Sequence, residues 1–247
     1  MRPAYREHRP PVGLELLVEC LWENEPDTDT VQRVVPDGCV DIIWLHEREL
    51  VITGADSQAR RVPLRGATRL SGIRLAPGAA GPVLGIPASE VRDQDVPLAL
   101  VWGEQGRMLA DAIAAASAPR RLHLLAEVVA QRNATLDPLV NAAMCRLNAA
   151  DARTGRIAAE LGVSERQFLR RIEASVGYGP KMLARVARLR RLATLADGPL
   201  AARALAAGYA SQAHMNDEVR RLTGVTPVVF LADPGLARKG GTVQVAS

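Results

Sequence analysis

The hydrophobic positions of the chain change their spacing near residue 77. Before it, short runs rich in valine, isoleucine and leucine alternate with turn residues at roughly 10-residue spacing, a pattern typical of an antiparallel sheet or small barrel. These runs cover residues 31–35, 39–45, 50–53, 61–64 and 70–75. Residues 1–12 are rich in proline and arginine and predict a loosely held arm. The apolar stretch 14–22 follows, and its pattern does not determine whether it is a helix or a strand.

After residue 77 the pattern becomes helical. Residues 79–84 predict one turn of helix before Gly85, and three stretches rich in alanine and leucine predict longer helices. These stretches are residues 96–116, 119–132 and 136–148. We therefore expect an α+β chain with a small β-rich N-terminal domain that also contains helices (residues 1–134), an all-α domain (135–234) and a disordered tail (235–247).

The last third of the chain contains one motif twice. Residues 157–180 read I-A-A-E-L-G-V-S-E-R-Q-F-L-R-R-I-E-A-S-V-G-Y-G-P, and residues 203–227 read R-A-L-A-A-G-Y-A-S-Q-A-H-M-N-D-E-V-R-R-L-T-G-V-T-P. The turn glycine, the final glycine and the proline recur at offsets of 46, 47 and 47 residues. Each copy predicts a short helix, a glycine turn, a polar N-cap and a second helix. That is the layout of a helix-turn-helix, whose second helix enters the DNA major groove.

In the first copy, Thr154 is expected to cap helix 155–161, and Ser164 to cap the helix that ends at Gly177. On a helical wheel the core stripe of this second helix is Phe168, Leu169, Ile172 and Val176. The opposite face carries Arg166, Gln167, Arg170 and Ala174. Arginine reads guanine, and glutamine reads adenine, with paired hydrogen bonds in the major groove. A solvated helix face is the alternative, but the helix-turn-helix position favours contact with bases.

In the second copy, residues 200–207 predict the support helix, and Ser211 caps the reading helix. Its core stripe is Met215, Val219 and Leu222. The DNA-facing residues are Gln212, Ala213, His214, Asp217 and Arg220. Ala213 suits a thymine methyl group, and Gln212 and His214 suit base-edge acceptors.

A helix of residues 180–196 is predicted to join the two copies and to hold them about one turn of DNA, roughly 34 Å, apart. Its arginines either contact phosphates or form a solvated basic face. We assign phosphate contacts to Arg171, Lys181 and Arg221.

Charge separates the two parts of the chain. Residues 153–232 hold 13 basic and six acidic residues, a net charge of +7. The remainder holds 18 basic and 21 acidic residues, a net charge of −3, which gives +4 for the whole chain. This asymmetry predicts a polyanion-binding C-terminal domain beside a nearly neutral partner domain.

The cysteines and histidines do not form a motif. Cys20, Cys39 and Cys145 lie far apart and are expected to be buried thiols, and no spacing predicts a structural zinc site, a disulfide framework or a cofactor site. Asp37, Cys39 and Asp41 alternate along one predicted strand, so an enzyme site there is one alternative. His46 falls on the other face of that strand, which weakens the alternative.

The duplicated motif resembles the C-terminal DNA-binding domain of the AraC family of bacterial transcription regulators. The resemblance covers residues 137–232, and its specific parts are A-A-E-L-G-V-S-E-R-Q-F, G-Y-G-P, A-A-G-Y-A-S-Q-A-H-M and R-R-L-T-G-V-T-P. It implies two helix-turn-helix units joined by a long helix and bound to adjacent segments of the major groove. Asp217 departs from the family, which usually has a basic residue there, and either accepts from cytosine N4 or repels phosphate.

The N-terminal part is similar to a regulatory domain often found before such units. The resemblance rests on R-V-V-P-D-G-C-V-D-I-I-W at residues 33–44 and L-A-P-G-A-A at residues 75–80. It implies a β-rich, often cupin-like domain that senses an effector or dimerises.

Together these features predict a bacterial, sequence-specific transcription regulator, controlled by a small-molecule effector or by homodimerisation, and not an enzyme. The alternative is effector-independent DNA binding with an N-terminal domain that only dimerises. We expect a cytoplasmic protein without membrane contact, because no apolar run reaches about 18 residues and the first residues lack a signal-peptide pattern.

Overall fold

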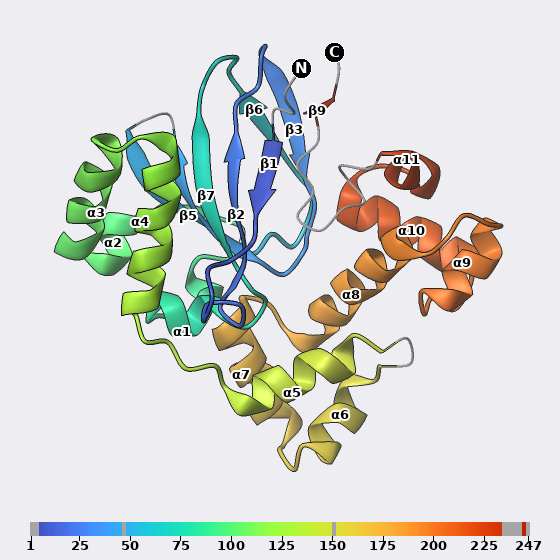
Figure 1. Ribbon diagram of the computed structural model, residues 1–247. Helices are drawn as coiled ribbons and strands as arrows, with labels where there is room; N and C mark the ends of the chain where they lie inside the picture. Colours follow the sequence, from blue (N-terminus) through green and yellow to red (C-terminus); the bar gives the residue numbers. More distant parts are fainter. Residues whose placement is uncertain (1–4, 46–47, 150–151, 234–243, 246–247) are drawn as a thin grey trace.

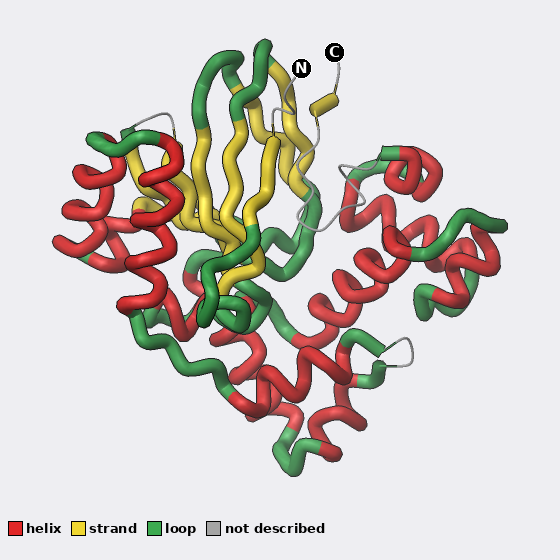
Figure 2. Tube along the Cα trace, viewed as in Figure 1, coloured by secondary structure: helices red, strands yellow, loops and turns green. Residues whose placement is uncertain are grey.

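The computed structural model describes residues 5–45, 48–149, 152–233 and 244–245. A β-rich N-terminal part is followed by a helical C-terminal part, as predicted (Figures 1 and 2). Helices α2–α4 lie on one side of the sheet, and α5–α11 extend below and beside it (Figure 1). The predicted fold class is therefore confirmed at this level.

Two antiparallel sheets form the N-terminal part. The larger has the order β1-β2-β7-β4-β5-β8, and the smaller has the order β6-β3-β9. The larger sheet consists of β1 (Tyr5–His8), β2 (Val18–Asn24), β7 (Leu70–Leu75), β4 (Val40–Leu45), β5 (Glu49–Thr53) and β8 (Asp95–Pro97). The smaller consists of β6 (Arg60–Leu64), β3 (Thr30–Val34) and β9 (Gln244–Val245). The hydrophobic runs of the sequence thus mark the strands.

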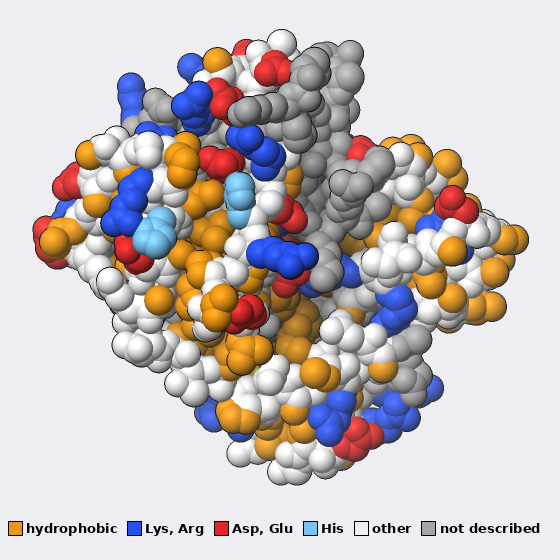
Figure 3. All heavy atoms as spheres, viewed as in Figure 1, with side chains coloured by type: hydrophobic (Ala, Val, Ile, Leu, Met, Phe, Trp, Pro, Cys, Tyr) orange, Lys and Arg blue, Asp and Glu red, His pale blue; other side chains and the backbone are white. Residues whose placement is uncertain are grey.

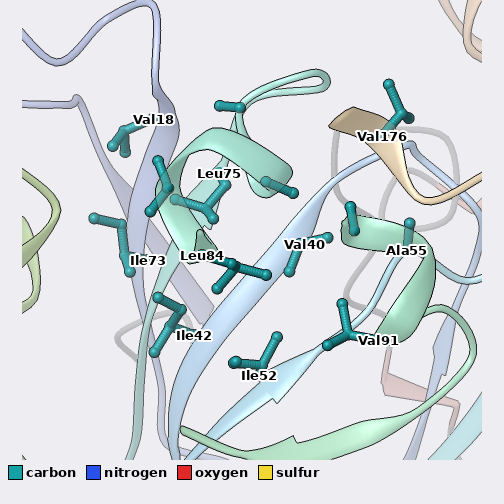
Figure 4. Packing of buried hydrophobic residues seen from close by; sticks show 14 of the residues in the cluster. Val18, Val40, Ile42, Ile52, Ala55, Ile73, Leu75, Leu84, Val91 and Val176 are labelled. Atoms are coloured by element: carbon teal, nitrogen blue, oxygen red, sulfur yellow. The ribbon is translucent and has the colours of Figure 1, made fainter. Parts of the chain in front are cut away.

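The alternation of residues along β4 gives the larger sheet two different faces. Val40, Ile42 and Trp44 are buried against the helices, and Figure 4 shows Ile52 and Ile73 beside Val40 and Ile42. The opposite face meets the smaller sheet in a separate apolar cluster. That cluster contains Cys20, Trp22, Leu64 and Leu70.

Helices of the N-terminal part follow β7. They are α1 (Ala80–Leu84), the 3₁₀ turn η1 (Ala88–Glu90), α2 (Leu98–Trp102), α3 (Glu104–Ala114) and α4 (Ala118–Gln131). The single predicted helix over residues 96–116 was wrong, because β8 and α2 precede α3 and the chain turns at Gly103. Gly103 has φ +56° and ψ −128°, a conformation that side chains disfavour and that ends α2.

The predicted loose arm was also wrong for residues 5–8. These residues form β1, which pairs with β2, and the Tyr5 ring lies 6.0 Å from the Trp22 ring, centroid to centroid. The predicted disordered tail lies outside the described residues, except that Gln244 and Val245 pair with β3.

The C-terminal part is helical throughout its described residues. Its helices are α5 (Pro138–Leu147), α6 (Thr154–Glu160), α7 (Glu165–Val176), α8 (Pro180–Thr194), α9 (Leu200–Ala206), α10 (Gln212–Thr223) and α11 (Pro227–Ala232). One hydrophobic cluster runs from the larger sheet through α1 into α5–α8, and a second fills the space among α8–α11. Among the described residues, no helix is long and apolar enough to span a membrane.

Candidate nucleic-acid interface

The first helix-turn-helix unit consists of α6, the turn at Gly162 and α7 (residues 154–177). Ser164 caps α7 by accepting a hydrogen bond from the Gln167 amide at 3.2 Å, and the Gln167 side chain accepts from the Ser164 amide at 3.1 Å. This reciprocal capping box fixes the start of α7. The predicted cap at Thr154 was wrong by one residue, because Arg153 occupies the N-cap of α6 and Thr154 is its first residue.

The core of this unit follows the predicted stripe with one exception. Phe168, Ile172 and Val176 are buried, but Leu169 is 42% exposed and lies against Gly179. Hydrophobic burial therefore orients α7 through three of the four predicted positions.

The predicted reading residues of α7 lie at its exposed N-terminal half. Arg166, Gln167 and Arg170 are exposed, and no ion pair within the described residues engages either arginine. The Gln167 carboxamide oxygen is occupied by the capping box, so bidentate contact with adenine would require that box to open. The two arginines are the stronger candidates for base contact.

The second helix-turn-helix unit consists of α9, the turn at Gly208 and α10 (residues 200–224). Ser211 caps α10 by accepting from the His214 amide at 3.1 Å, as predicted. Met215, Val219 and Leu222 are fully buried, also as predicted. The opposite face of α10 is therefore turned to solvent.

The predicted DNA-facing side of α10 is less basic than that of α7. Gln212, Ala213, Asp217 and Arg220 are exposed. His214 is half-buried, its Nδ1 accepts from the Ala210 amide at 3.2 Å, and its ring stands edge-on to the Tyr209 ring. With Nδ1 as an acceptor, the neutral ring carries its proton on Nε2 and has a donor to offer.

The arginines of α8 brace the fold, which neither predicted role anticipated. Arg185 donates to Glu218 at 2.6 Å, and the Arg188 guanidinium lies 5.7 Å from the centre of the Tyr209 ring. Arg190 donates to the Asp37 carbonyl at 3.2 Å, and Arg191 donates to the carbonyls of Ala207 and Asn148. These side chains tie α8 to its neighbours.

Two of the three assigned phosphate contacts are engaged within the protein. Arg171 pairs with Asp137, the N-cap of α5, and Arg221 lies 3.6 Å from Glu218. Burial raises the pKa of Asp137, but hydrogen bonds from Arg171 and the Leu139 amide outweigh it and leave the pKa below its ordinary value. Lys181, at the start of α8, is exposed.

Within residues 153–232, the exposed cations without an ion pair occupy five positions. They are Arg153, Arg166, Arg170, Lys181 and Arg220. Arg153, at the N-cap of α6, was not predicted, although its position before the support helix of the first unit was visible in the sequence. Four of the five belong to the first unit or to the start of α8, so positive charge is concentrated there.

The alternative site at Asp37 and Cys39 has the geometry of a structural turn. Asp37 accepts from the Cys39 amide at 2.8 Å, and Cys39 is buried. Burial, together with the Asp37 carboxylate, raises the pKa of the Cys39 thiol well above its ordinary value, so the reactive thiolate is disfavoured. His46 lies outside the described residues.

Asp41 and Cys145 lie in different surroundings. Asp41 accepts from the Trp22 indole at 2.7 Å and from Arg74 at 3.2 Å, so it serves as a buried anchor of the sheet. Cys145 is exposed, so the prediction of three buried thiols was wrong at that position, and the described residues contain no grouping of three potential metal ligands.

Comparisons with known proteins agree with the geometry of the C-terminal part. Residues 157–233 match a family described as a helix-turn-helix domain, and residues 6–97 match a domain of unknown function, DUF6597. The C-terminal part is therefore a helix-turn-helix domain of the AraC type, as predicted. The match to residues 6–97 does not test the role expected of the P-D-G-C-V-D motif. No curated protein matches the chain.

Solved structures give a distant similarity along most of the chain. ToxT from Vibrio cholerae O395 has a TM-score of 0.44 and 11% identity, over 93% of this chain and 97% of that one. Unsaturated fatty acid-bound ToxT from Vibrio cholerae strain SCE256 has a TM-score of 0.40 and 12% identity, over 84% of this chain and 88% of that one.

Proposed function

We propose that this protein is a sequence-specific DNA-binding regulator of transcription that reads one asymmetric site with both helix-turn-helix units. The observation that carries the proposal is the exposure of both reading faces while both apolar stripes are buried. An amphipathic helix with its polar face free, placed after a support helix and a turn, suits the major groove.

The first unit supplies the main base contacts in this mechanism. The N-terminal half of α7 enters the groove, where Arg166 and Arg170 each donate two hydrogen bonds to a guanine edge. Arg153, at the N-cap of α6, and Lys181, at the start of α8, flank this unit and meet phosphates, which position the helix without reading sequence.

The second unit reads through smaller and less charged groups. Ala213 contacts a thymine methyl, while Gln212 and the Nε2 proton of His214 donate to base-edge acceptors. Arg220 meets a base or phosphate further along α10. Asp217 faces the same side and favours cytosine, whose N4 is a donor.

Selection of duplexes from a random library, followed by gel shifts, tests this function. We expect one enriched asymmetric site, and phosphate contacts of Arg153, Lys181 and Arg220 predict a log–log salt slope of about −3. The double variant Arg166→Ala and Arg170→Ala should lose the preference for that site, whereas Arg107→Ala, an exposed position on α3, should retain it. Binding that ignores sequence in the wild-type protein would contradict the proposal.

We also propose that the N-terminal domain controls this binding through a small-molecule effector. The support for this proposal is the resemblance of residues 33–44 and 75–80 to a regulatory domain that senses an effector. The alternative, a domain that only dimerises, predicts a homodimer and no ligand. A thermal-shift screen separates the two, because a ligand of the native state raises the melting temperature. Cytoplasmic location stays a prediction.

A further inference from the structure

The two short motifs of the N-terminal domain meet the DNA-binding domain through bare glycine backbone. A Cβ atom on Gly38, in P-D-G-C, would lie 3.1 Å from the Tyr178 hydroxyl and 3.7 Å from Leu183. A Cβ atom on Gly78, in L-A-P-G-A-A, would lie 3.2 Å from Val140 of α5. Side chains of the C-terminal domain thus rest directly on these two turns.

The closest approach is between α1 and α7. A Cβ atom on Gly81 would lie 2.2 Å from the Ala174 carbonyl oxygen, a backbone atom that no side-chain movement can displace. One turn further, a Cβ atom on Gly177 would lie 3.3 Å from Ala55 and 3.2 Å from the Ala88 carbonyl oxygen. The first unit is therefore seated on α1 and η1, and the two share one hydrophobic core.

This contact lies on the same stripe of α7 as the two arginines predicted to read DNA. Arg166, Arg170 and Ala174 are spaced four residues apart and lie on one stripe of the helix. Ala174 was predicted to face DNA, but its turn of the helix packs against α1. Contact with the N-terminal domain therefore begins one helical turn beyond Arg170.

The same domain also holds the second unit, at a separate place. Arg33 of β3 donates to the Thr223 carbonyl at 3.0 Å, at the C-terminus of α10 where helix carbonyls lack partners. Val35 is part of the hydrophobic cluster of α8 and α10. Arg190 reaches from α8 to the Asp37 carbonyl and lies 3.6 Å from Glu19.

We propose that the N-terminal domain is a brace that fixes the angle and spacing of the two helix-turn-helix units, so that both fit one DNA face together. This inference rests on the proposed function and names what positions its two reading helices. Gly38, Gly78, Gly81 and Arg33 are positioning residues. The brace does not shield the site, because Arg166, Arg170 and Gln212 are exposed while the domains are docked.

Two pairs of variants separate the brace from general stability. Gly81→Ala raises helix propensity in α1 but collides with the Ala174 carbonyl, and Gly198→Ala is its control, because nothing lies within 4 Å of a Cβ atom there. Arg33→Met removes the contact with α10, and its control is Arg61→Met, the exposed cross-strand neighbour of Arg33. Far-ultraviolet circular dichroism establishes folding, and Arg33→Met carries the test should Gly81→Ala not fold.

The first measurement needs no DNA. Spin labels at Ala159→Cys in α6 and Ala206→Cys in α9, in a Cys145→Ser background, report the distance between the two units. Both positions are exposed, and Cys20 and Cys39 are buried. We expect one narrow distance distribution in the wild type and both controls, and a broad one in Gly81→Ala and Arg33→Met. Equally narrow distributions in all five proteins would overturn the brace.

The second measurement uses the duplex selected with the wild-type protein, a half-site duplex and a duplex with five inserted base pairs. Loss of the brace should weaken binding to the full site about tenfold, leave half-site binding within about twofold, and reduce discrimination between the two spacings. Tighter full-site binding would identify an inhibitory contact and refute the brace. If the wild type selects no duplex, the proposed function fails, and the label distances still decide whether the brace exists.

Discussion

The two helix-turn-helix units follow one sequence plan but are held in different ways. The core of the first unit is continuous with that of the N-terminal domain, through Phe168, Ile172 and Val176. The core of the second is a separate cluster around Met215 and Val219. Equivalent motifs therefore do not imply equivalent mechanical roles: the first unit is anchored in the larger body, and the second is attached through α8 and a few contacts.

Their reading faces differ in the same sense. Arg166 and Arg170 stand on α7, whereas α10 presents Arg220 and Asp217. Because phosphate attraction supplies much of the affinity and base contacts supply selectivity, the first unit is suited to anchoring the protein on DNA. The second unit is suited to adjusting the preference.

The largest effect is expected from the cores. Ile172→Ala and Met215→Ala each remove a fully buried side chain, which costs about 2–5 kcal/mol. Because Ile172 lies in the shared core, its loss should raise hydrogen exchange in α1 and β4 as well as in α7. Met215→Ala should raise exchange only in α8–α11, and Leu205→Ala, at a position that is 62% exposed, should change little. Unchanged exchange in α1 for Ile172→Ala would show that the cores are independent.

The next largest effects are expected from the ion pairs that link α10 to α8 and α7 to the start of α5. Glu218 is 11% exposed beside Arg185, so Glu218→Gln should cost about 2 kcal/mol of unfolding free energy by leaving a partly buried guanidinium without its counter-charge. Asp137 is 21% exposed beside Arg171, and Asp137→Asn keeps an N-cap residue, so it should cost below about 1 kcal/mol. Chemical denaturation of both variants measures the difference, and equal losses would contradict this ranking.

Acid should act on the pair of Asp137 and Arg171 in a defined direction. The pKa of Asp137 in the folded protein lies below its ordinary value of 3.8, so its stabilising contribution is present above that value and is lost as pH falls through the folded pKa. Asp137→Asn should therefore flatten the pH dependence of unfolding below about pH 4. A curve with the wild-type shape would show that Arg171 does not stabilise the ionised carboxylate.

DNA affinity gives the third comparison. Arg166→Ala or Arg170→Ala should lose about 1–3 kcal/mol of binding free energy and relax one position of the site. Arg220→Ala should lose less, because Asp217 lowers the positive potential around it. Titrations on the selected duplex at one salt concentration measure both, and a larger loss for Arg220→Ala would reverse the assignment of roles.

Local signals in the sequence account for the elements that were predicted well. The observed strands β3–β7 begin and end within one residue of the hydrophobic runs, because turn residues bound each run of strand-forming residues. Ser164 and Ser211 cap their helices as predicted, because a cap depends on neighbours three residues away. Phe168 and Met215 were placed in the cores by helical period alone.

Features set by distant contacts escaped prediction. Residues 5–8 form a strand only because β2 offers them a partner edge. Arg190 links α8 to the N-terminal domain because its guanidinium donates to the carbonyl of Asp37, 153 residues earlier. In the sequence, Gly81 is only a poor helix former. The structure shows that its missing side chain leaves room for the backbone of α7. Sequence patterns predict which side chains face away from a helix's own core. The tertiary fold then decides which of those side chains remain exposed and able to contact DNA.

The smallest expected effect concerns Asp217, which distinguishes the second unit most sharply from the first. Asp217→Arg replaces an exposed negative charge by a positive one on the reading face of α10, so non-specific binding should tighten by about 1 kcal/mol and the salt slope should steepen by about one. Asp111→Arg, at an exposed position of α3, makes the same change in net charge away from the DNA and should alter neither. Equal effects of the two substitutions would mean that α10 responds only to the net charge of the protein, and the second unit would then have no reading role of its own.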